Sequence, residues 1–207
     1  MKLLIMGAQG AGKGTAAEKL SVMYNIPTIS TGDLFRGAVK SGSELGLKLK
    51  EIMDAGNLVP DELTLQILNN RLAEKDCQNG YILDGFPRTL EQAYLLENIA
   101  SIDKVIYLDV DMSIIVDRLA GRRTCPKCSH IHNIKFAGDP DYCSECGTKY
   151  VVRSDDTEDA IKKRLATFTQ KTLPIVDYYR KQGKVLEVNA NVDPEYTLKQ
   201  ITEGLGK

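Results

Sequence analysis

The feature that most constrains the fold of this chain is a glycine-rich stretch near its N-terminus. Residues 7–15 read GAQGAGKGT and directly follow the apolar run 3–6, which has the composition of a buried strand. Because glycines lack Cβ atoms, successive backbone N–H groups can turn inward around an anion, and a helix that begins there adds its positive dipole end. Lys13 completes a GxxxxGK pattern and would meet the β- and γ-phosphates of a nucleotide. The stretch predicts a strand, a phosphate-binding loop and a helix, and a plain glycine turn is the weaker alternative.

One position of this loop departs from the general pattern. Gly14 stands where such loops carry Ser or Thr, and the hydroxyl follows one residue later at Thr15. The sequence therefore leaves open whether a side chain of the loop ligates magnesium directly.

Short apolar runs alternate along the chain with segments of helical spacing. The runs cover residues 2–6, 27–30, 81–84, 104–109 and 184–188. Such runs are typical of strands buried on both faces. Helical spacing occurs in 45–53, which ends before Gly56, and in 65–72, which follows Pro60-Asp61. The alternation predicts an α/β fold with a doubly wound parallel sheet, whose ligands bind beyond the carboxyl ends of the strands.

Composition narrows the class of partner and the compartment. A chain of 207 residues is long enough for one core with an inserted lobe, and a net charge of −1 gives no global attraction to nucleic acid or membranes. The N-terminus does not have the pattern of a signal peptide, and no stretch approaches the roughly 18 apolar residues of a membrane span. We therefore expect small-molecule ligands and a cytoplasmic location, in which the five cysteines are reduced or bind a metal.

Four of these cysteines lie in a stretch, 124–152, that breaks the alternation of strands and helices. Cys125, Cys128, Cys143 and Cys146 form two CxxC pairs separated by fourteen residues, the spacing of a four-cysteine zinc site. Since thiolates fill all four positions, we expect a structural zinc ion that replaces the missing core of this insert. Iron or cobalt would suit the same ligands, and two disulfides or a redox pair are the weaker alternatives.

The three remaining metal-ligand candidates are expected to lie outside this site. His130 and His132 are close enough in sequence to compete as ligands, but we interpret them as surface or nucleotide-facing residues. Cys77 stands alone and is interpreted as a small, partly buried apolar residue.

Two further polar segments follow predicted strands. Residues 30–36 (STGDLFR) open a helix, and residues 84–92 (DGFPRTLEQ) form a rigid turn that projects Arg88. Asp84, at a strand end, is a candidate for holding the magnesium shell, with helix capping as its plain alternative. Arginines flank the insert on both sides, at positions 118, 122, 123, 153 and 164. Their placement indicates closure over a polyanionic substrate.

At this point the chain resembles the adenylate kinases, in the long-lid form with a zinc-binding lid. The resemblance covers essentially the whole length and rests on GAQGAGKGT (7–15), STGDLFR (30–36), NLVPDELT (57–64), DGFPRTLEQA (84–93), DRLAGRR (117–123), the four cysteines and RSDD (153–156). It implies a P-loop fold with a five-stranded parallel sheet, a core of 1–29, 60–120 and 155–207, an AMP-binding helical segment at 30–59 and a zinc-binding lid at 121–154.

The resemblance also implies a role for each site residue. On the ATP side it implies Gly10, Ala11, Gly12, Lys13, Gly14, Thr15, Arg118, Arg122, Ile131, His132 and Val192. On the AMP side it implies Thr31, Arg36, Asn57, Leu58, Val59, Gly85, Phe86, Pro87, Arg88, Gln92, Arg153 and Arg164. The predicted catalytic groups are Lys13, Asp84, Arg88, Arg122, Arg153 and Arg164.

Two residues depart from the family pattern. Gln9 replaces a proline that is common at this position of the loop, where we expect a small effect. Cys146 stands where the family often has an aspartate as the fourth metal ligand.

The expected reaction is reversible phosphoryl transfer, Mg·ATP + AMP to two ADP, by a monomer with magnesium and a structural zinc ion. Catalysis would be positioning plus electrostatic stabilisation without a covalent intermediate. A UMP/CMP kinase is the nearest alternative. Thr31 disfavours it, because the pyrimidine enzymes, which otherwise resemble this chain, carry a small apolar residue at this position. A zinc-ribbon nucleic-acid-binding protein is disfavoured by the acidic residues of the insert, and a nucleotide sensor without turnover is the third alternative.

Overall fold

The computed structural model describes residues 1–206, which fold around a parallel sheet. The strand order is β2-β3-β1-β4-β7, and every neighbouring pair in this sheet is parallel. The bounds are β1 Lys2–Met6, β2 Thr28–Ser30, β3 Tyr81–Asp84, β4 Lys104–Asp109 and β7 Val185–Asn189. The predicted five-stranded parallel sheet is therefore confirmed, with β2 beginning one residue later than predicted and β7 shifted by one residue.

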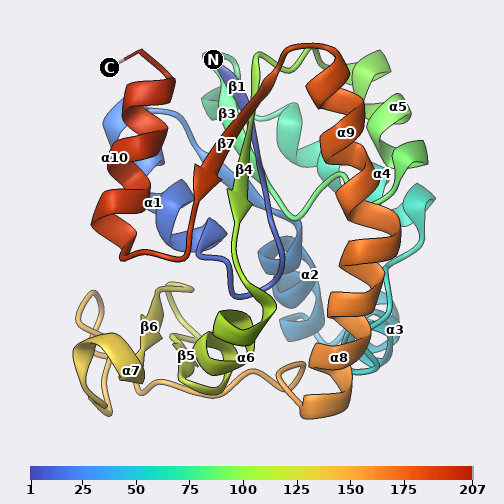
Figure 1. Cartoon of the computed structure of the whole chain (residues 1–207). Coiled ribbons are helices and arrows are strands. Elements are labelled where there is room, and N and C mark those ends of the chain that lie inside the picture. The colour runs from blue at the N-terminus through green and yellow to red at the C-terminus, as the bar shows by residue number, and fades with distance from the viewer. Residues whose placement is uncertain (207) are drawn as a thin grey trace.

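Helices cover both faces of this sheet. In Figure 1, α1 (Lys13–Tyr24) and α10 (Pro194–Gly204) lie on one side, while α4 (Asp61–Leu72), α5 (Leu90–Ile99) and α9 (Leu173–Lys181) lie on the other. Strand β1 serves both sides by simple alternation, because successive side chains of a strand point to opposite faces. Leu3 and Ile5 pack with α1 and α10, and Leu4 and Met6 pack with α4, α5 and α9.

Two excursions leave the sheet at the carboxyl ends of its strands. The first contains α2 (Thr31–Lys40) and α3 (Glu44–Asp54), and it has a small apolar cluster of its own around Phe35, Leu49 and Val59. Helix α3 ends as predicted before Gly56, which has a φ of 67°.

The second excursion follows α6 (Met112–Ala120). Strands β5 (Arg122–Thr124) and β6 (Ile131–Asn133) pair antiparallel and lead into the short helix α7 (Ile134–Ala137). Figure 1 shows this insert lying below the carboxyl ends of the strands. Its buried cluster is small, since it consists of Cys125, Cys143 and Tyr150 with Cys146 packed against them.

The chain returns from the insert through one long, irregular helix. Helix α8 (Glu158–Thr167) continues into the π-helical segment η2 (Phe168–Thr172) and then into α9, and together they run along one side of the molecule (Figure 1). A short 3₁₀ turn, η1 (Lys75–Cys77), precedes β3 and places Cys77 in the core, so this residue is more deeply buried than the partial burial that was predicted. Within residues 1–206 no helix is both long and apolar enough to cross a membrane.

Candidate active site

The phosphate loop turns between β1 and α1 in a conformation that requires glycine. Gly10 and Gly12 have φ values of 81° and 95°, which side-chain-bearing residues rarely adopt. A Cβ at Gly10 would also lie 3.1 Å from the Leu119 side chain, whereas the space next to Gly12 is open. The loop therefore packs tightly against α6 on one side and presents the N-terminus of α1 to an open cleft on the other.

Lys13 lies in the first turn of α1 and is folded back onto this loop. Its Nζ donates hydrogen bonds of 2.8 Å to the carbonyl oxygens of Gly7 and Ala8. Burial lowers the pKa of Lys13 to about 8, against the opposing pull of the Asp84 carboxylate, while nearby arginines lower it further. Because both hydrogen bonds of the Lys13 ammonium group go to neutral carbonyl groups, an anionic ligand could still neutralise its charge.

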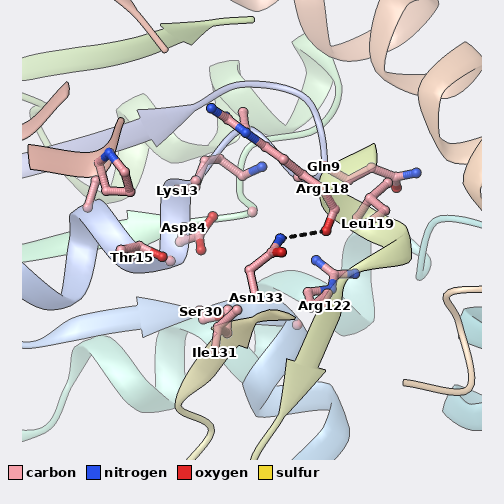
Figure 2. A pocket seen from close by; sticks show the side chains of 18 of the residues that line it. Gln9, Lys13, Thr15, Ser30, Asp84, Arg118, Leu119, Arg122, Ile131 and Asn133 are labelled. Atoms are coloured by element: carbon pink, nitrogen blue, oxygen red, sulfur yellow. Dashed lines mark hydrogen bonds between the residues drawn. The ribbon is translucent and has the colours of Figure 1, made fainter. Parts of the chain in front are cut away.

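The cleft in front of the loop has a volume of about 350 Å³ and takes its walls from core and insert together. Figure 2 shows Lys13, Thr15 and Asp84 of the core around the same pocket as Arg118 of α6 and Arg122 and Ile131 of the insert strands. All predicted ATP-side residues line it: Gly10, Ala11, Gly12, Lys13, Gly14, Thr15, Arg118, Arg122, Ile131, His132 and Val192. All predicted catalytic residues line it as well: Lys13, Asp84, Arg88, Arg122, Arg153 and Arg164.

Asp84 reaches the cleft because β3 ends between β1 and β2. It is the register partner of Ile5 on β1 and of Ser30 on β2, so the carboxyl ends of three strands meet at this point. Burial raises the pKa of Asp84, and Lys13 opposes that rise. The oxygen atoms of Asp84, Thr15 and Ser30 all face the same cleft, and hard cations such as Mg²⁺ prefer an oxygen donor set of this kind.

Four of the five arginines that flank the insert line this cleft, namely Arg118, Arg122, Arg153 and Arg164, whereas Arg123 does not. Two of the four have acidic partners that follow the insert. The Arg122 guanidinium pairs with Asp156, including a 2.8 Å bond from Nε, and Arg164 pairs with Asp155 at 2.7 Å. Arg153 donates from Nε to the Thr124 hydroxyl at 2.9 Å.

Crowding of these cations leaves an excess of positive charge at the centre. Burial lowers the pKa of Arg88 and of Arg153 to about 10 each, and the neighbouring arginines Arg164 and Arg36 contribute to the lowering. Burial lowers the pKa of Arg164 as well, although Asp155 counteracts it. A bound polyphosphate would relieve this mutual repulsion.

A smaller cavity of about 40 Å³ opens beside the cleft, between α2 and β3. Most predicted AMP-side residues line it: Thr31, Arg36, Asn57, Leu58, Val59, Gly85, Arg88, Gln92 and Arg164. Phe86 and Pro87 instead line a cavity of about 80 Å³ behind Lys13, and Arg153 lines only the large cleft. The Thr31 hydroxyl donates to the Gly85 carbonyl at 3.0 Å, which ties the start of α2 to the end of β3.

Several residues at the site were not singled out from the sequence. Phe136 of α7 lies 6.0 Å from the Arg118 guanidinium at the rim of the cleft. Asn133 donates to the Arg118 carbonyl at 2.8 Å, the bond that is dashed in Figure 2. Gln9 was noted from the sequence only as a departure from the family pattern; in the structure its Nε2 donates to the Ile161 carbonyl in α8 at 2.9 Å, so it connects the phosphate loop to the chain that leaves the insert. The sequence offered a signal only for the ion pairs of the site, because the RSDD motif contains Asp155 and Asp156, the partners of Arg164 and Arg122.

The four cysteines of the insert form one compact cluster. Their sulfur atoms all lie within 4.8 Å of one another, and the cysteines are not joined by disulfides. The backbone N–H groups of Lys127 and Cys128 point to the Cys125 sulfur at 3.4 and 3.5 Å. This donor set fits a tetrahedral metal ion with four thiolate ligands. The two histidines are not part of the cluster: His132 contacts the Gly138 carbonyl and stacks on Tyr150, and His130 lies 3.7 Å from Glu18.

Comparisons with known proteins agree with this geometry. The family profile described as adenylate kinase matches residues 5–184. An adenylate kinase of Geobacillus sp. (strain WCH70) is 46% identical over 213 residues, which cover 100% of this chain and 99% of that protein. An adenylate kinase of Oceanobacillus iheyensis is 45% identical with complete coverage of both chains, and one of Desulfitobacterium hafniense is 44% identical over 99% of this chain and 98% of its own.

Proposed function

The chain belongs to the adenylate kinase family, and from that premise we propose that its cleft transfers a phosphoryl group reversibly from Mg·ATP to AMP, giving two ADP. The observation that carries this proposal is the junction of the two cavities. Arg36, Arg88 and Arg164 line both the large cleft and the small cavity, so a donor in one and an acceptor in the other would meet at the same guanidinium groups.

The large cleft takes ATP in this proposal. The N–H groups of the phosphate loop and Lys13 bind the triphosphate, and Arg118 and Val192 lie at the far end, where the base would rest. Arg118 donates to the carbonyl oxygens of Ala190 and Val192 at 2.9 and 3.2 Å, which holds that end of the cleft in shape.

The small cavity takes AMP. Thr31, Asn57, Leu58, Val59 and Gln92 surround the nucleoside, and Arg36 and Arg88 bind its phosphate. Gly85, Phe86 and Pro87 form the turn that carries Arg88 to this position. Segment 30–59 is the AMP-binding unit of this proposal, 121–154 is the lid, and 1–29, 60–120 and 155–207 form the core.

Transfer itself needs stabilisation of the charge that spreads over the equatorial oxygens of the moving phosphoryl group. Lys13, Arg88, Arg122, Arg153 and Arg164 surround the point where the cavities meet and supply that stabilisation. Magnesium, when bound with ATP, neutralises charge on the β- and γ-phosphates. Asp84, with the hydroxyls of Thr15 and Ser30, offers the oxygen atoms that would hold its hydration shell.

Zinc is the proposed metal of the lid, with Cys125, Cys128, Cys143 and Cys146 as its ligands and a structural role. Metal analysis of the purified protein tests the identity, since iron or cobalt in its place would contradict it. We further propose a monomer, because the apolar faces of α1, α5, α9 and α10 are buried against the sheet. A cytoplasmic location is proposed because reduced cysteines are expected there. Light scattering of the eluting protein tests the oligomeric state.

The reaction is tested by measuring ADP formation from Mg·ATP with AMP, UMP, CMP or GMP as the only acceptor. We expect rapid turnover with AMP and slow or no turnover with the other acceptors. Turnover with UMP or CMP at the rate of AMP would overturn the acceptor assignment. ATP binding without turnover on any acceptor would overturn the proposed reaction and favour a nucleotide sensor.

A further inference from the structure

The backbone of Arg88 is held by side chains from two different parts of the chain. Its N–H donates to the Gln92 side-chain carbonyl at 2.7 Å, and its carbonyl oxygen accepts a 2.9 Å hydrogen bond from the Thr172 hydroxyl. The Arg88 side chain folds back so that Nε donates to the Gly85 carbonyl at 2.7 Å. The direction of this guanidinium is therefore set by its bond to the Gly85 carbonyl and by the two bonds that hold the Arg88 backbone.

Of these two partners, only Gln92 is close to Arg88 in sequence. Gln92 lies in the first turn of α5, whereas Thr172 is separated from Arg88 by 84 residues and belongs to the helix that returns from the lid. Thr172 has only 9% of its surface exposed, so its hydroxyl has been withdrawn from water to make this bond.

The π-helical segment η2 accounts for the inward direction of Thr172. A π segment accommodates an extra residue in the helical turn, and one residue corresponds to a rotation of about 100° in a regular α-helix. Thr172 is the last residue of η2, directly before α9. Residues Thr169, Gln170 and Lys171 of the same segment are exposed, while Thr172 is buried against the turn that carries Arg88. Such irregular turns are frequent at functional sites.

The space behind the reacting centre shows why this contact matters. The cavity of about 80 Å³ is lined by Lys13, Arg88 and Arg164 on the side of the nucleotides, and by Phe168 and Thr172 of η2 on the other. The Arg88 turn thus borders this cavity as well as the large cleft, and the Thr172 hydroxyl bonds to the turn from the wall that η2 forms.

We propose that Thr172 is a positioning residue for phosphoryl transfer, which acts by fixing the Arg88 carbonyl so that the guanidinium stays aimed at the transferring group. This proposal rests on the role of Arg88 in the proposed function. Since a displacement of about 1 Å can cost 10²-fold in rate, loss of one such bond should affect catalysis more than stability.

The test compares three substitutions in the same segment. Thr172→Val keeps the shape and removes the hydroxyl, Thr172→Ser keeps the hydroxyl, and Thr169→Val removes a hydroxyl that bonds only to the Leu165 carbonyl of its own helix, at 3.2 Å. We expect Thr172→Val to lower kcat about tenfold with little change in KM for Mg·ATP, and the other two variants to stay within about threefold of the parent enzyme. A kcat for Thr172→Val no lower than for Thr169→Val would overturn the proposal.

A double-mutant cycle with Arg88→Ala separates positioning from a general structural effect. If Thr172 acts through Arg88, Thr172→Val should cause almost no further loss of kcat once the Arg88 side chain is gone. The same tenfold loss in the Arg88→Ala background would overturn the proposal while leaving the proposed reaction intact. The proposed function fails in a different way, namely if the unmodified enzyme does not turn over ATP with AMP, or if Arg88→Ala alone has no effect.

Discussion

The parallel sheet and the lid are stabilised by different means, although both face the same cleft. The sheet has a large apolar cluster on each face, built from strand residues such as Leu3 and Leu4 that alternate between them. The lid has only Cys125, Cys143 and Tyr150 as fully buried members of its cluster. A core of that size cannot offset the conformational entropy of a segment of about 30 residues, so the metal proposed for the four sulfur atoms would take its place.

The same contrast divides the cations of the site. Lys13 and Arg88 are anchored to backbone carbonyls of the core, whereas Arg122 and Arg153 extend from the lid side and bond to Asp156 and Thr124. The core therefore supplies charges whose positions do not depend on the lid. The lid supplies charges whose positions depend on whether it is folded. The following predictions test this division, from the largest effect to the smallest.

The largest effect is expected from removing the core arginine. Arg88→Ala should lower kcat by about 10²–10³-fold and leave the melting temperature almost unchanged, because the side chain stabilises charge in the transition state. Arg123→Ala is the matched control, since this arginine lies in β5 next to Arg122 but lines none of the three cavities described above. Steady-state kinetics of both variants check the prediction. A kcat for Arg88→Ala within threefold of the control would contradict it.

Metal removal should unfold the lid while the sheet stays folded. After treatment with a strong chelator we expect proteases to cleave within residues 124–152, while the far-ultraviolet circular dichroism of the sheet and its helices is largely retained. Binding to four thiolates contributes roughly 10 kcal/mol or more in isolated zinc peptides, which exceeds what three buried side chains can supply. Limited proteolysis and dichroism on the same samples make the comparison.

Substitution of single cysteines provides the control for metal removal. Cys143→Ser should abolish stoichiometric metal binding and give the same cleavage pattern as the chelator. Cys77→Ser should retain the full metal content, because Cys77 is buried beside Arg71 and outside the cluster. A lid that resists proteolysis equally with and without metal would contradict the idea that the metal replaces its core.

The pH dependence should reveal the buried ammonium group of the core. Because burial lowers the pKa of Lys13 to about 8, its charge is lost in the free enzyme as the pH rises through that value. We expect kcat/KM for Mg·ATP to fall about tenfold per pH unit above pH 8, whereas kcat should hold to higher pH because bound phosphates favour the charged form.

The linkage to stability has the opposite sign. Between pH 8 and pH 10.5 the unfolded chain keeps the Lys13 proton that the folded chain has lost, so this group makes the free energy of unfolding of the nucleotide-free protein rise with pH. Lys13→Arg is the control for both effects, since arginine has a higher intrinsic pKa than lysine and keeps its charge as the pH rises through 8. A variant whose kcat/KM declines above pH 8 as steeply as that of the parent enzyme would show that another group titrates.

Sequence patterns predicted most of the sheet and most of the residues that line the cavities, but not the contacts between distant segments. Runs 2–6, 81–84 and 104–109 became strands with unchanged bounds, because strands buried on both faces leave an unbroken apolar signal. The strand order carries no such signal. Asp155 and Asp156 stand in the RSDD motif, but the sequence does not show which arginines they pair with. The Thr172 contact depends on a π-helical turn that spacing does not reveal.

Sequence and structure assign different roles to Gln9, and its substitution gives the smallest predicted effect. A family-wide preference for proline suggests a residue that only shapes the loop, yet the Gln9 amide connects the loop to the Ile161 carbonyl, 152 residues away and three residues before Arg164. Gln9→Leu should cost about 1 kcal/mol of stability and lower kcat two- to fivefold, since one hydrogen bond to a helix backbone is lost while the arginine keeps its bond to Asp155.

The matched control for Gln9 is Gln9→Pro, which restores the residue common in the family. If Gln9 only shapes the loop, the proline variant should equal or exceed the parent enzyme in kcat and in melting temperature. If the bond to α8 matters, Gln9→Pro should lose as much kcat as Gln9→Leu despite its stiffer loop. The second outcome would mean that catalysis depends on the contact between the phosphate loop and α8, the core helix through which the chain returns from the lid, so the core would not be a single fixed unit for catalysis.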